Sequence, residues 1–112
     1  MNLNKRDIGR IRVVDVEEAR IDAAVAISFK DAMRQLSDDA PGDVVLNLAE
    51  VGFVDSSGLG AIVAAMKGLD DGRRLHLAAL TPAVEKVFRL TRMDSVFEIF
   101  PSVRDALSGS DE

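Results

Sequence analysis

Residues 44–69 have the sequence VVLNLAEVGFVDSSGLGAIVAAMKGL, in which an apolar run, a polar turn and a periodic segment follow one another. The run 44–48 is β-branched and apolar on both faces, which is typical of a central strand in a sheet. After the turn at residues 55–58, apolar side chains recur at the spacing of a helix: Leu59, Ile62, Val63, Met66 and Leu69. The stretch therefore predicts a strand–turn–helix unit of an α/β protein.

Further strands are predicted on both sides of this unit. Residues 11–16 are β-branched and bounded by charge, and residues 74–80 alternate between apolar and polar side chains. Residues 96–100 form a final short apolar run, and a weaker strand is expected around Leu3. Each predicted strand except the first pair is separated from the next by a segment with helical periodicity.

The helices between these strands have recognisable boundaries. Asp22 stands where an N-cap is expected, and the helix that follows ends before Pro41. Thr81 and Pro82 open another helix, with Thr81 as N-cap, and Ser102 can cap a last short one. The resulting order, ββαβαβαβα, predicts an α/β fold with a mixed, mostly parallel β-sheet packed with about four helices.

Length and composition limit what the protein can be. Its 112 residues suit one domain, and we predict that domain at residues 1–107 with a polar tail at residues 108–112. Cysteine is absent, which excludes thiol catalysis and cysteine-ligated metal sites and fits a reducing compartment. The N-terminus lacks the apolar region of a signal peptide, and the apolar stretches are too short to span a membrane. We therefore expect a cytoplasmic protein without a membrane partner.

The charge and the scarce aromatic residues argue against nucleic-acid binding. Nineteen acidic and fourteen basic residues give a net charge of −5, whereas sequence-independent binding to nucleic acids depends on Lys and Arg. Five Phe and no Trp or Tyr offer little for base stacking. His76 is the only histidine and lies in a predicted strand without a cluster of carboxylates, so we predict no metal and no cofactor.

The turn at residues 55–58 places Ser56 where a helix begins. The first N–H groups of a helix have no intrahelical partner, and the helix macrodipole makes this end electropositive. The turn also follows an extended segment at residues 51–54, and α/β proteins usually carry their functional loops at the carboxyl ends of strands. Ser56 is therefore the candidate functional residue.

Two interpretations of this turn are open from the residues alone. Gly58 and Gly60 each cost about 1 kcal/mol relative to Ala in a helix interior, so we expect something, such as another backbone, to approach closely there. In the other interpretation, Asp55, Ser56 and Ser57 are competing N-caps and the glycine relaxes the turn.

The ordered motifs resemble the STAS domain of bacterial anti-sigma factor antagonists. The resemblance rests on the strand at residues 44–48 followed by Val-Asp-Ser-Ser-Gly-Leu-Gly at residues 54–60. Residues 20–22 stand where the family has a segment that ends in an aspartate before its first helix. Residues 81–84 match the opening of its third helix, and residues 90–97 match the end of that helix and the last strand. The resemblance covers nearly the full chain and implies a single STAS-like domain.

This resemblance implies a function that periodicity and composition do not. In the family, the serine directly after the aspartate, here Ser56, is phosphorylated by a partner that is both an anti-sigma factor and a serine kinase. The unphosphorylated antagonist binds that partner and frees a sigma factor, phosphorylation breaks the interaction, and a serine phosphatase restores it. The protein would then be a monomer or weak dimer that is a substrate and not an enzyme. The implied partner-binding residues are Asp22, Asp55, Ser57, Gly58, Leu59 and Gly60.

One position departs from the family pattern. Ala19 stands where the family usually has a glycine, three residues before Asp22. This difference affects the expected local turn and not the expected phosphorylation of Ser56.

Three other functions are weighed against this one. The nearest is a STAS subunit of a lipid-transport or other signalling complex, but such subunits tend to lose the complete Asp-Ser-Ser-Gly string. A phosphoacceptor receiver domain needs an acidic pair after its first strand and a lysine after its last, and no lysine follows Phe100. A hydrolase would need a histidine placed as a base and a Gly-x-Ser-x-Gly elbow around its serine, and neither is present around Ser56.

Overall fold

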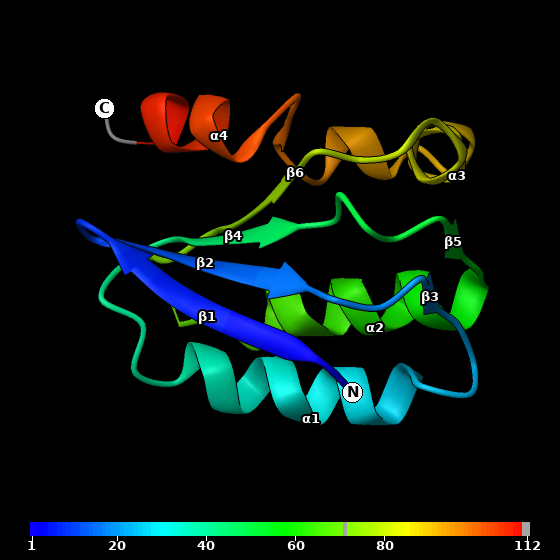
Figure 1. The fold of residues 1–112 in the computed structure, drawn as a ribbon, viewed down its shortest axis with the longest axis horizontal. Helices are drawn as coiled ribbons and strands as arrows, with labels where there is room; N and C mark the ends of the chain where they lie inside the picture. The colour runs from blue at the N-terminus through cyan, green and yellow to red at the C-terminus, as the bar shows by residue number, and fades with distance from the viewer. Residues whose placement is uncertain (71, 111–112) are drawn as a thin grey trace.

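The structure is a computed structural model that describes residues 1–70 and 72–110, and its strands and helices alternate along the chain (Figure 1). The strands are β1 (Leu3–Ile8), β2 (Ile11–Val16), β3 (Arg20–Ile21), β4 (Val44–Asn47), β5 (Phe53–Val54), β6 (Leu75–Ala78) and β7 (Ile99–Phe100). The helices are α1 (Ala26–Ser37), α2 (Ser56–Lys67), α3 (Pro82–Leu90) and α4 (Val103–Ser110), with a short 3-10 helix, η1 (Met93–Ser95).

Five strands form one mixed sheet in the order β1-β2-β4-β6-β7. Strand β1 is antiparallel to β2, and all other neighbours are parallel, in the register Val14↔Leu46 and Leu46↔Leu77. The strand predicted to be central, β4, lies in the middle of this sheet, and its first three residues are buried. The predicted α/β fold with a mixed, mostly parallel sheet and four helices is confirmed.

Helices cover both faces of the sheet, as Figure 1 shows. A hydrophobic core lies on each face of the sheet. Residues of β2 contribute to the two cores in alternation, because successive side chains of a strand point to opposite faces. Val14 and Val16 join the larger core under α1 and α2, whereas Ile11 and Val13 join a smaller core under α4. Helix α3 packs near β5 and adds the buried Phe88 to the larger core.

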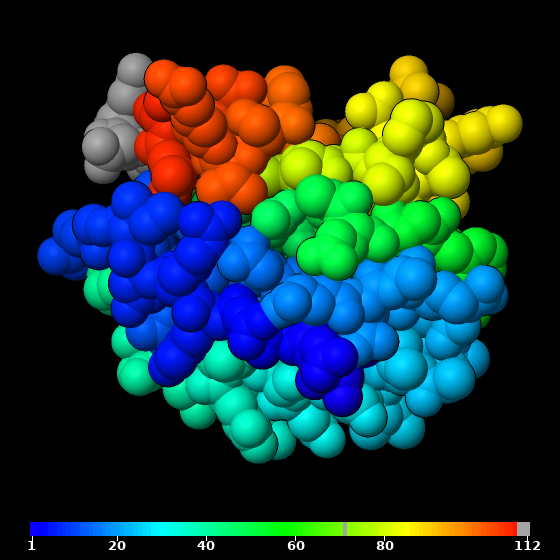
Figure 2. All heavy atoms as spheres, in the orientation of Figure 1, coloured from blue at the N-terminus to red at the C-terminus, as the bar shows by residue number. Residues whose placement is uncertain are grey.

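Strands β3 and β5 form a second, two-stranded parallel sheet that was not predicted as such. Arg20 pairs with Phe53, and Ile21 pairs with Val54. The segment predicted as extended before the Ser56 turn contains β5, but its partner β3 contains only two residues, too few to give a periodic signal. In Figure 2 the light-blue segment that follows β2 and the green segment around β5 lie next to each other on the surface. This small sheet connects the start of α2 to the segment before α1.

Two predicted helix boundaries need correction. Asp22 is not the N-cap of α1, since that helix begins at Ala26 with Val25 in the capping position. The Asp22 carboxylate instead accepts a hydrogen bond from the N–H of Ala24 at 3.1 Å, which closes a local turn in the way that Asx turns do. Helix α4 extends to Ser110, so part of the predicted polar tail is helical, and residues 111–112 lie outside the described residues.

The remaining predicted caps lie where they were expected. Thr81 is the N-cap of α3, with Pro82 in the first turn, although its hydroxyl donates to the carbonyl of Val51 at 2.8 Å and accepts no capping hydrogen bond from the helix. Ser102 Oγ accepts a hydrogen bond from the N–H of Asp105 at 3.1 Å at the start of α4. Among residues 1–70 and 72–110, no helix has the length and apolar character needed to cross a bilayer.

Candidate functional site

The start of α2 is fixed by the carboxylate of Asp55, which is the N-cap of that helix. One oxygen, Oδ1, accepts a hydrogen bond from the N–H of Gly58 at 2.8 Å. The other oxygen, Oδ2, accepts one from the N–H of Ala23 at 3.2 Å, across a sequence separation of 32 residues. A single side chain therefore joins the first turn of α2 to the turn that precedes α1.

The hydroxyl groups of Ser56 and Ser57 do not cap the helix. Both side chains are exposed, and within the described part of the chain neither hydroxyl has a hydrogen-bond partner. Of the two interpretations that the residues left open, competing capping by three side chains is wrong, because Asp55 alone makes the cap. Ser56 is an exposed, unengaged hydroxyl at the first position of a fixed helix.

Gly58 is buried where α2 crosses the backbone of β3. A Cβ atom at this position would lie 1.9 Å from the carbonyl oxygen of Ile21 and 2.7 Å from its carbonyl carbon. The close approach predicted for this glycine is therefore confirmed, and the approaching backbone belongs to the chain itself. Gly60 differs, since no atom of the described residues lies within 4 Å of the position that its Cβ would occupy.

An aromatic and a basic side chain lie on the β3–β5 pair, which directly precedes the turn that carries Ser56, and the sequence did not indicate either. The guanidinium of Arg20 lies 4.3 Å from the ring centroid of Phe53, across the β3–β5 pair. Nε of Arg20 also donates to Oδ2 of Asp22 at 3.1 Å, so the arginine is held from two sides. Phe53 is 42% exposed, which is large for an aromatic ring. We call Arg20, Asp22, Phe53, Ser56 and Ser57 the Ser56 surface.

The predicted partner-binding residues occupy different environments in the structure. Asp22 and Asp55 come from separate segments and meet at the turn around Ala23, where each accepts a backbone hydrogen bond. Leu59 is half-buried and packs against the larger core, and Gly58 is buried, so both support the position of the loop. Ser57 and Gly60 are exposed. Contact of these residues with a partner stays a prediction.

The histidine of the chain lies away from this surface. His76 is buried at the amino end of β6, with Nε2 3.0 Å from Oδ2 of Asp43, whereas Ser56 follows the carboxyl end of β5. Within residues 1–70 and 72–110, no group of three or more His, Cys, Asp or Glu side chains is arranged to hold a metal ion. The chemistry that Ser56 offers is that of an exposed hydroxyl acceptor at an electropositive helix end.

We expect Asp55→Ala to lower the free energy of unfolding by about 1–2 kcal/mol, because it removes the N-cap of α2 and leaves the N–H of Ala23 without its acceptor. Urea denaturation followed by circular dichroism measures this loss. Ser57→Ala is the matched control, since its hydroxyl has no hydrogen-bond partner among the residues described, and its effect should stay within about 0.5 kcal/mol. Equal stability of the Asp55→Ala protein and the wild type would contradict the role given to the cap.

The chain is similar to known proteins in sequence and in structure. The STAS domain family matches residues 2–106 of the chain. An anti-sigma-B factor antagonist of Staphylococcus aureus is 22% identical over 101 residues, which cover 88% of this chain and 94% of that protein. The crystal structure of an anti-sigma factor antagonist from Mycobacterium paratuberculosis is 27% identical, with a TM-score of 0.89 over 99% of this chain and 94% of that one. The phosphorylated form of the Bacillus cell fate determinant SpoIIAA has a TM-score of 0.68 at 18% identity, over 97% and 99% of the two chains.

Proposed function

The chain belongs to the STAS domain family, and on this basis we propose that it is an anti-sigma factor antagonist switched by phosphorylation of Ser56. Unphosphorylated, it would bind an anti-sigma factor that is also a serine kinase, and so release a sigma factor in the bacterial cytoplasm. Phosphorylation of Ser56 would end this binding, and a serine phosphatase would restore it. The names of its relatives support the first part of this proposal. In this scheme the protein is a substrate and not a catalyst.

One observation carries the assignment of Ser56. A kinase needs an acceptor hydroxyl that is accessible and not engaged in a hydrogen bond that holds the fold together. The hydroxyls of Ser56 and Ser57 both meet these conditions, because Asp55 has taken over the cap of α2. The resemblance of residues 54–60 to the family motif then selects Ser56, the serine directly after the aspartate. The Asp55 cap also holds the start of the helix in place, so that a kinase meets the hydroxyl in one position.

The effect of the phosphate follows from its charge. A phosphoserine carries about −1.5 to −2 charges at neutral pH and three acceptor oxygens. N–H groups in the first turn of α2 can donate hydrogen bonds to the phosphate oxygens, so the fold of this chain need not change. The carboxylates of Asp22 and Asp55 add negative charge nearby, so a partner surface that buries the phosphate must either neutralise it or desolvate it at a cost of several kcal/mol. Loss of binding is therefore the expected result of phosphorylation.

We expect Ser56→Ala to abolish phosphorylation and to leave binding constitutive, and Ser56→Asp to weaken binding by about tenfold or more. Each purified ATP-binding anti-sigma factor of the source bacterium is tested for binding by calorimetry and for phosphate transfer by mass spectrometry. Ser57→Ala and Ser57→Asp are the matched controls, and they should still be phosphorylated on Ser56. The proposal is wrong if none of these factors binds, or if the kinase labels the Ser56→Ala protein as fully as the wild type.

A further inference from the structure

The ring of Phe53 is the aromatic side chain that this protein exposes most. It is 42% exposed on β5, three residues before Ser56. The other four phenylalanines are buried or half-buried: Phe29, Phe88, Phe97 and Phe100. A phenyl ring offers a large apolar area that a partner can bury, so Phe53 is a candidate contact outside the phosphorylation site itself.

Neighbouring groups hold this ring in one position. The guanidinium of Arg20 lies 4.3 Å from the ring centroid, and Nε of the same arginine donates to Oδ2 of Asp22 at 3.1 Å. The pairing of β3 with β5 fixes the backbone on both sides of this contact. A side chain that is ordered before binding loses less conformational entropy when a partner buries it, which favours Phe53 as an anchor for a partner.

Two segments at the carboxyl ends of β2 and β4 lie side by side around Phe53. The N–H of Gly52 donates to the carbonyl of Ala19 at 2.9 Å, and β3 pairs with β5 directly after this hydrogen bond. Figure 2 shows the two segments next to each other on the surface. We call residues 17–24 and 49–57 the paired segments.

The paired segments carry a large part of the net charge of the protein. Five carboxylates and one cation give them a net charge of −4, where the whole chain carries −5. The loops at residues 79–81 and 101–102, which follow β6 and β7 at the same end of the sheet, contain no charged residue. The charged side chains of the paired segments are Glu17, Glu18, Arg20, Asp22, Glu50 and Asp55.

This negative charge is not cancelled by ion pairs. Arg20, the one cation, is already paired with Asp22. Within residues 1–70 and 72–110, the side chains of Glu17, Glu18 and Glu50 make no ion pair. Glu17 and Glu50 are also exposed. The paired segments therefore favour a partner that brings Lys or Arg side chains.

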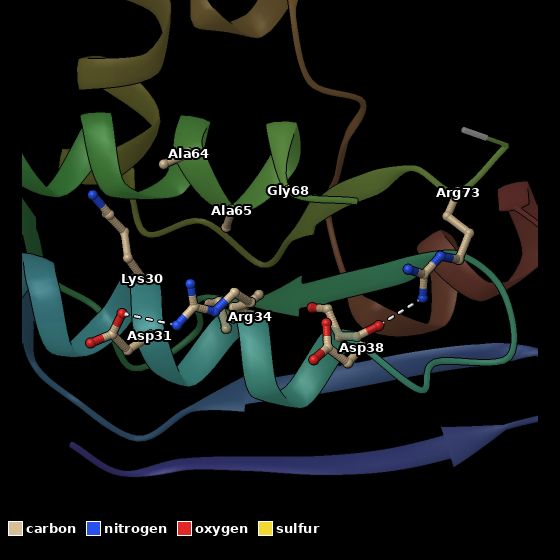
Figure 3. A pocket seen from close by; sticks show the side chains of 10 residues that line it. Lys30, Asp31, Arg34, Asp38, Ala64, Ala65, Gly68 and Arg73 are labelled. Carbon is tan, nitrogen blue, oxygen red and sulfur yellow. Dashed lines mark hydrogen bonds and ion pairs between the residues drawn. The ribbon is translucent and has the colours of Figure 1, made fainter. Parts of the chain in front are cut away.

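The cleft between α1 and α2 has no such excess of charge. Arg73, which lines it, is paired with Asp70 at 3.0 Å. Charge therefore does not select a partner for this cleft, whereas it does for the paired segments. Figure 3 shows the remaining charged side chains of the cleft, two cations and two carboxylates: Lys30, Arg34, Asp31 and Asp38.

We propose that Phe53 is the anchor by which this protein binds the anti-sigma factor, and that it enters an apolar pocket of the partner whose rim carries Lys or Arg side chains facing Glu17 and Glu50. This inference rests on the proposed function and names the chemistry of the partner's contact. A few aromatic anchors commonly supply most of the binding free energy of an interface, and charges at its rim mainly increase the association rate and the specificity.

The order of residues along the paired segments agrees with loss of binding on phosphorylation. Phe53 lies three residues after Glu50 and three residues before Ser56. Cations of the partner that face the glutamates are thus on the other side of Phe53 from Ser56, and they are not placed to neutralise a phosphate there. Phosphorylation therefore adds charge beside the anchor without a matching cation.

The first experiment removes the ring and keeps a strand-forming residue. Phe53→Thr is titrated by calorimetry against the anti-sigma factor that binds wild type and fails to bind Ser56→Asp, and we expect binding to weaken by about tenfold or more. Ile8→Thr is the matched control, because Ile8 is also 42% exposed but lies at the opposite end of β2, and it should leave affinity within twofold of wild type.

Phosphorylation kinetics separate an anchor from a residue that only supports the fold. If Phe53 binds the partner without touching the phosphate, Phe53→Thr should raise KM for phosphorylation of Ser56 by about tenfold and leave kcat within twofold. A displaced Ser56 would instead lower kcat. A normal KM with a lowered kcat would therefore mean that Phe53 acts only by positioning the serine, and the inference would be wrong.

The second experiment reverses the charge of the rim. The double variant Glu17→Lys, Glu50→Lys should bind about tenfold more weakly than wild type at low salt, with a smaller loss at high salt. The double variant Asp94→Lys, Glu98→Lys is the matched control, since it makes the same change in total charge at exposed residues between α3 and β7. If the control weakens binding as much, total charge and not the rim is responsible, and the basic rim of the partner is refuted.

Failure of this inference can be told apart from failure of the proposed function. If Phe53→Thr binds as tightly as wild type while Ser56→Asp does not bind, Phe53 is not the anchor but the proposed function stands. If no anti-sigma factor binds the wild type, the proposed function fails and the inference about Phe53 fails with it.

Discussion

Gly58→Ala is expected to destabilise the protein by about 3 kcal/mol or more, although alanine is the better helix former. The added methyl group would lie 1.9 Å from the carbonyl oxygen of Ile21, a contact that no folded backbone allows. A flexible side chain could move away, but this oxygen belongs to β3, which is held by its pairing with β5. Either α2 must move from the small sheet or the sheet must distort, and both changes displace Ser56.

Gly60→Ala is the matched control for this prediction. It lies two residues further along the same helix, and its added Cβ has no neighbour within 4 Å in the part of the chain that the structure describes. We expect Gly60→Ala to stabilise the protein by about 0.5–1 kcal/mol, because alanine has a higher helix propensity than glycine. Urea denaturation of both variants measures the difference. If Gly58→Ala and Gly60→Ala change stability in the same direction, the close contact between α2 and β3 is not what requires the glycine.

The elements that could be predicted are those whose side chains repeat with a clear period. The apolar run of β4 is buried on both faces, so residues 44–48 carry a continuous signal. Helices α1, α2 and α3 each place an apolar stripe on the larger core, and the stripe gives their position without knowledge of the tertiary structure. Helix ends were harder to predict. The carboxylate of Asp22 accepts a hydrogen bond within its own turn, from the N–H of Ala24, and does not cap α1.

The candidate site could be predicted in part. Its serine was found through the motif at residues 54–60, and its position at the start of a helix follows from local pattern. The division of roles between Asp55, Ser56 and Ser57 could not be read from the sequence, because all three are good caps. The Arg20–Phe53 contact was missed because it depends on the pairing of β3 with β5, two strands of two residues each.

Arg12 is the clearest case in which sequence pattern misleads. A charged residue in the second position of a predicted strand is expected to face solvent, yet the side chain of Arg12 is only 5% exposed. Its guanidinium donates to both oxygens of Asp7, at 2.7 and 2.8 Å, and to the carbonyl of Leu36 at 3.0 Å. It also contacts the carboxylate of Asp39. One side chain thus fastens the β1–β2 hairpin to the carboxyl end of α1, a contact between segments that are distant in sequence.

We expect Arg12→Leu to lower the free energy of unfolding by about 2–3 kcal/mol at neutral pH, because a buried guanidinium loses its hydrogen bonds to the exposed carboxylates of Asp7 and Asp39 and to the chain carbonyl of Leu36. The leucine fills part of the same volume but leaves the carbonyl of Leu36 without this donor. Arg104→Leu on α4 is the matched control, an exposed arginine whose replacement should change stability by no more than about 0.5 kcal/mol. Urea denaturation of the two variants beside the wild type gives the comparison.

The same variant should also change the response of stability to acid. Hydrogen bonds from Arg12 hold the pKa of Asp7 and the pKa of Asp39 below their usual value of 3.8. A carboxylate with a lowered pKa in the folded state contributes stability that is fully present above its unfolded pKa and is lost as the pH falls through its folded pKa. Arg12→Leu removes that contribution, so the difference in unfolding free energy between wild type and variant should stay the same from about pH 7 to about pH 5 and should narrow as the pH falls further to about pH 3.

Asp15 should preserve part of the pH dependence of the unfolding free energy in the Arg12→Leu variant. Burial raises the pKa of Asp15, but hydrogen bonds from Arg6 and Asn47 outweigh it, so the net shift is downward. These partners do not involve Arg12, so the variant should keep this part of its acid dependence. The free energy of unfolding of the wild type and of Arg12→Leu, measured at about pH 7, 4.5 and 3, tests this prediction. A gap that is as wide at the lowest pH as at neutral pH would mean that Arg12 acts through packing alone, and that its ion pairs with Asp7 and Asp39 contribute nothing to the folded state.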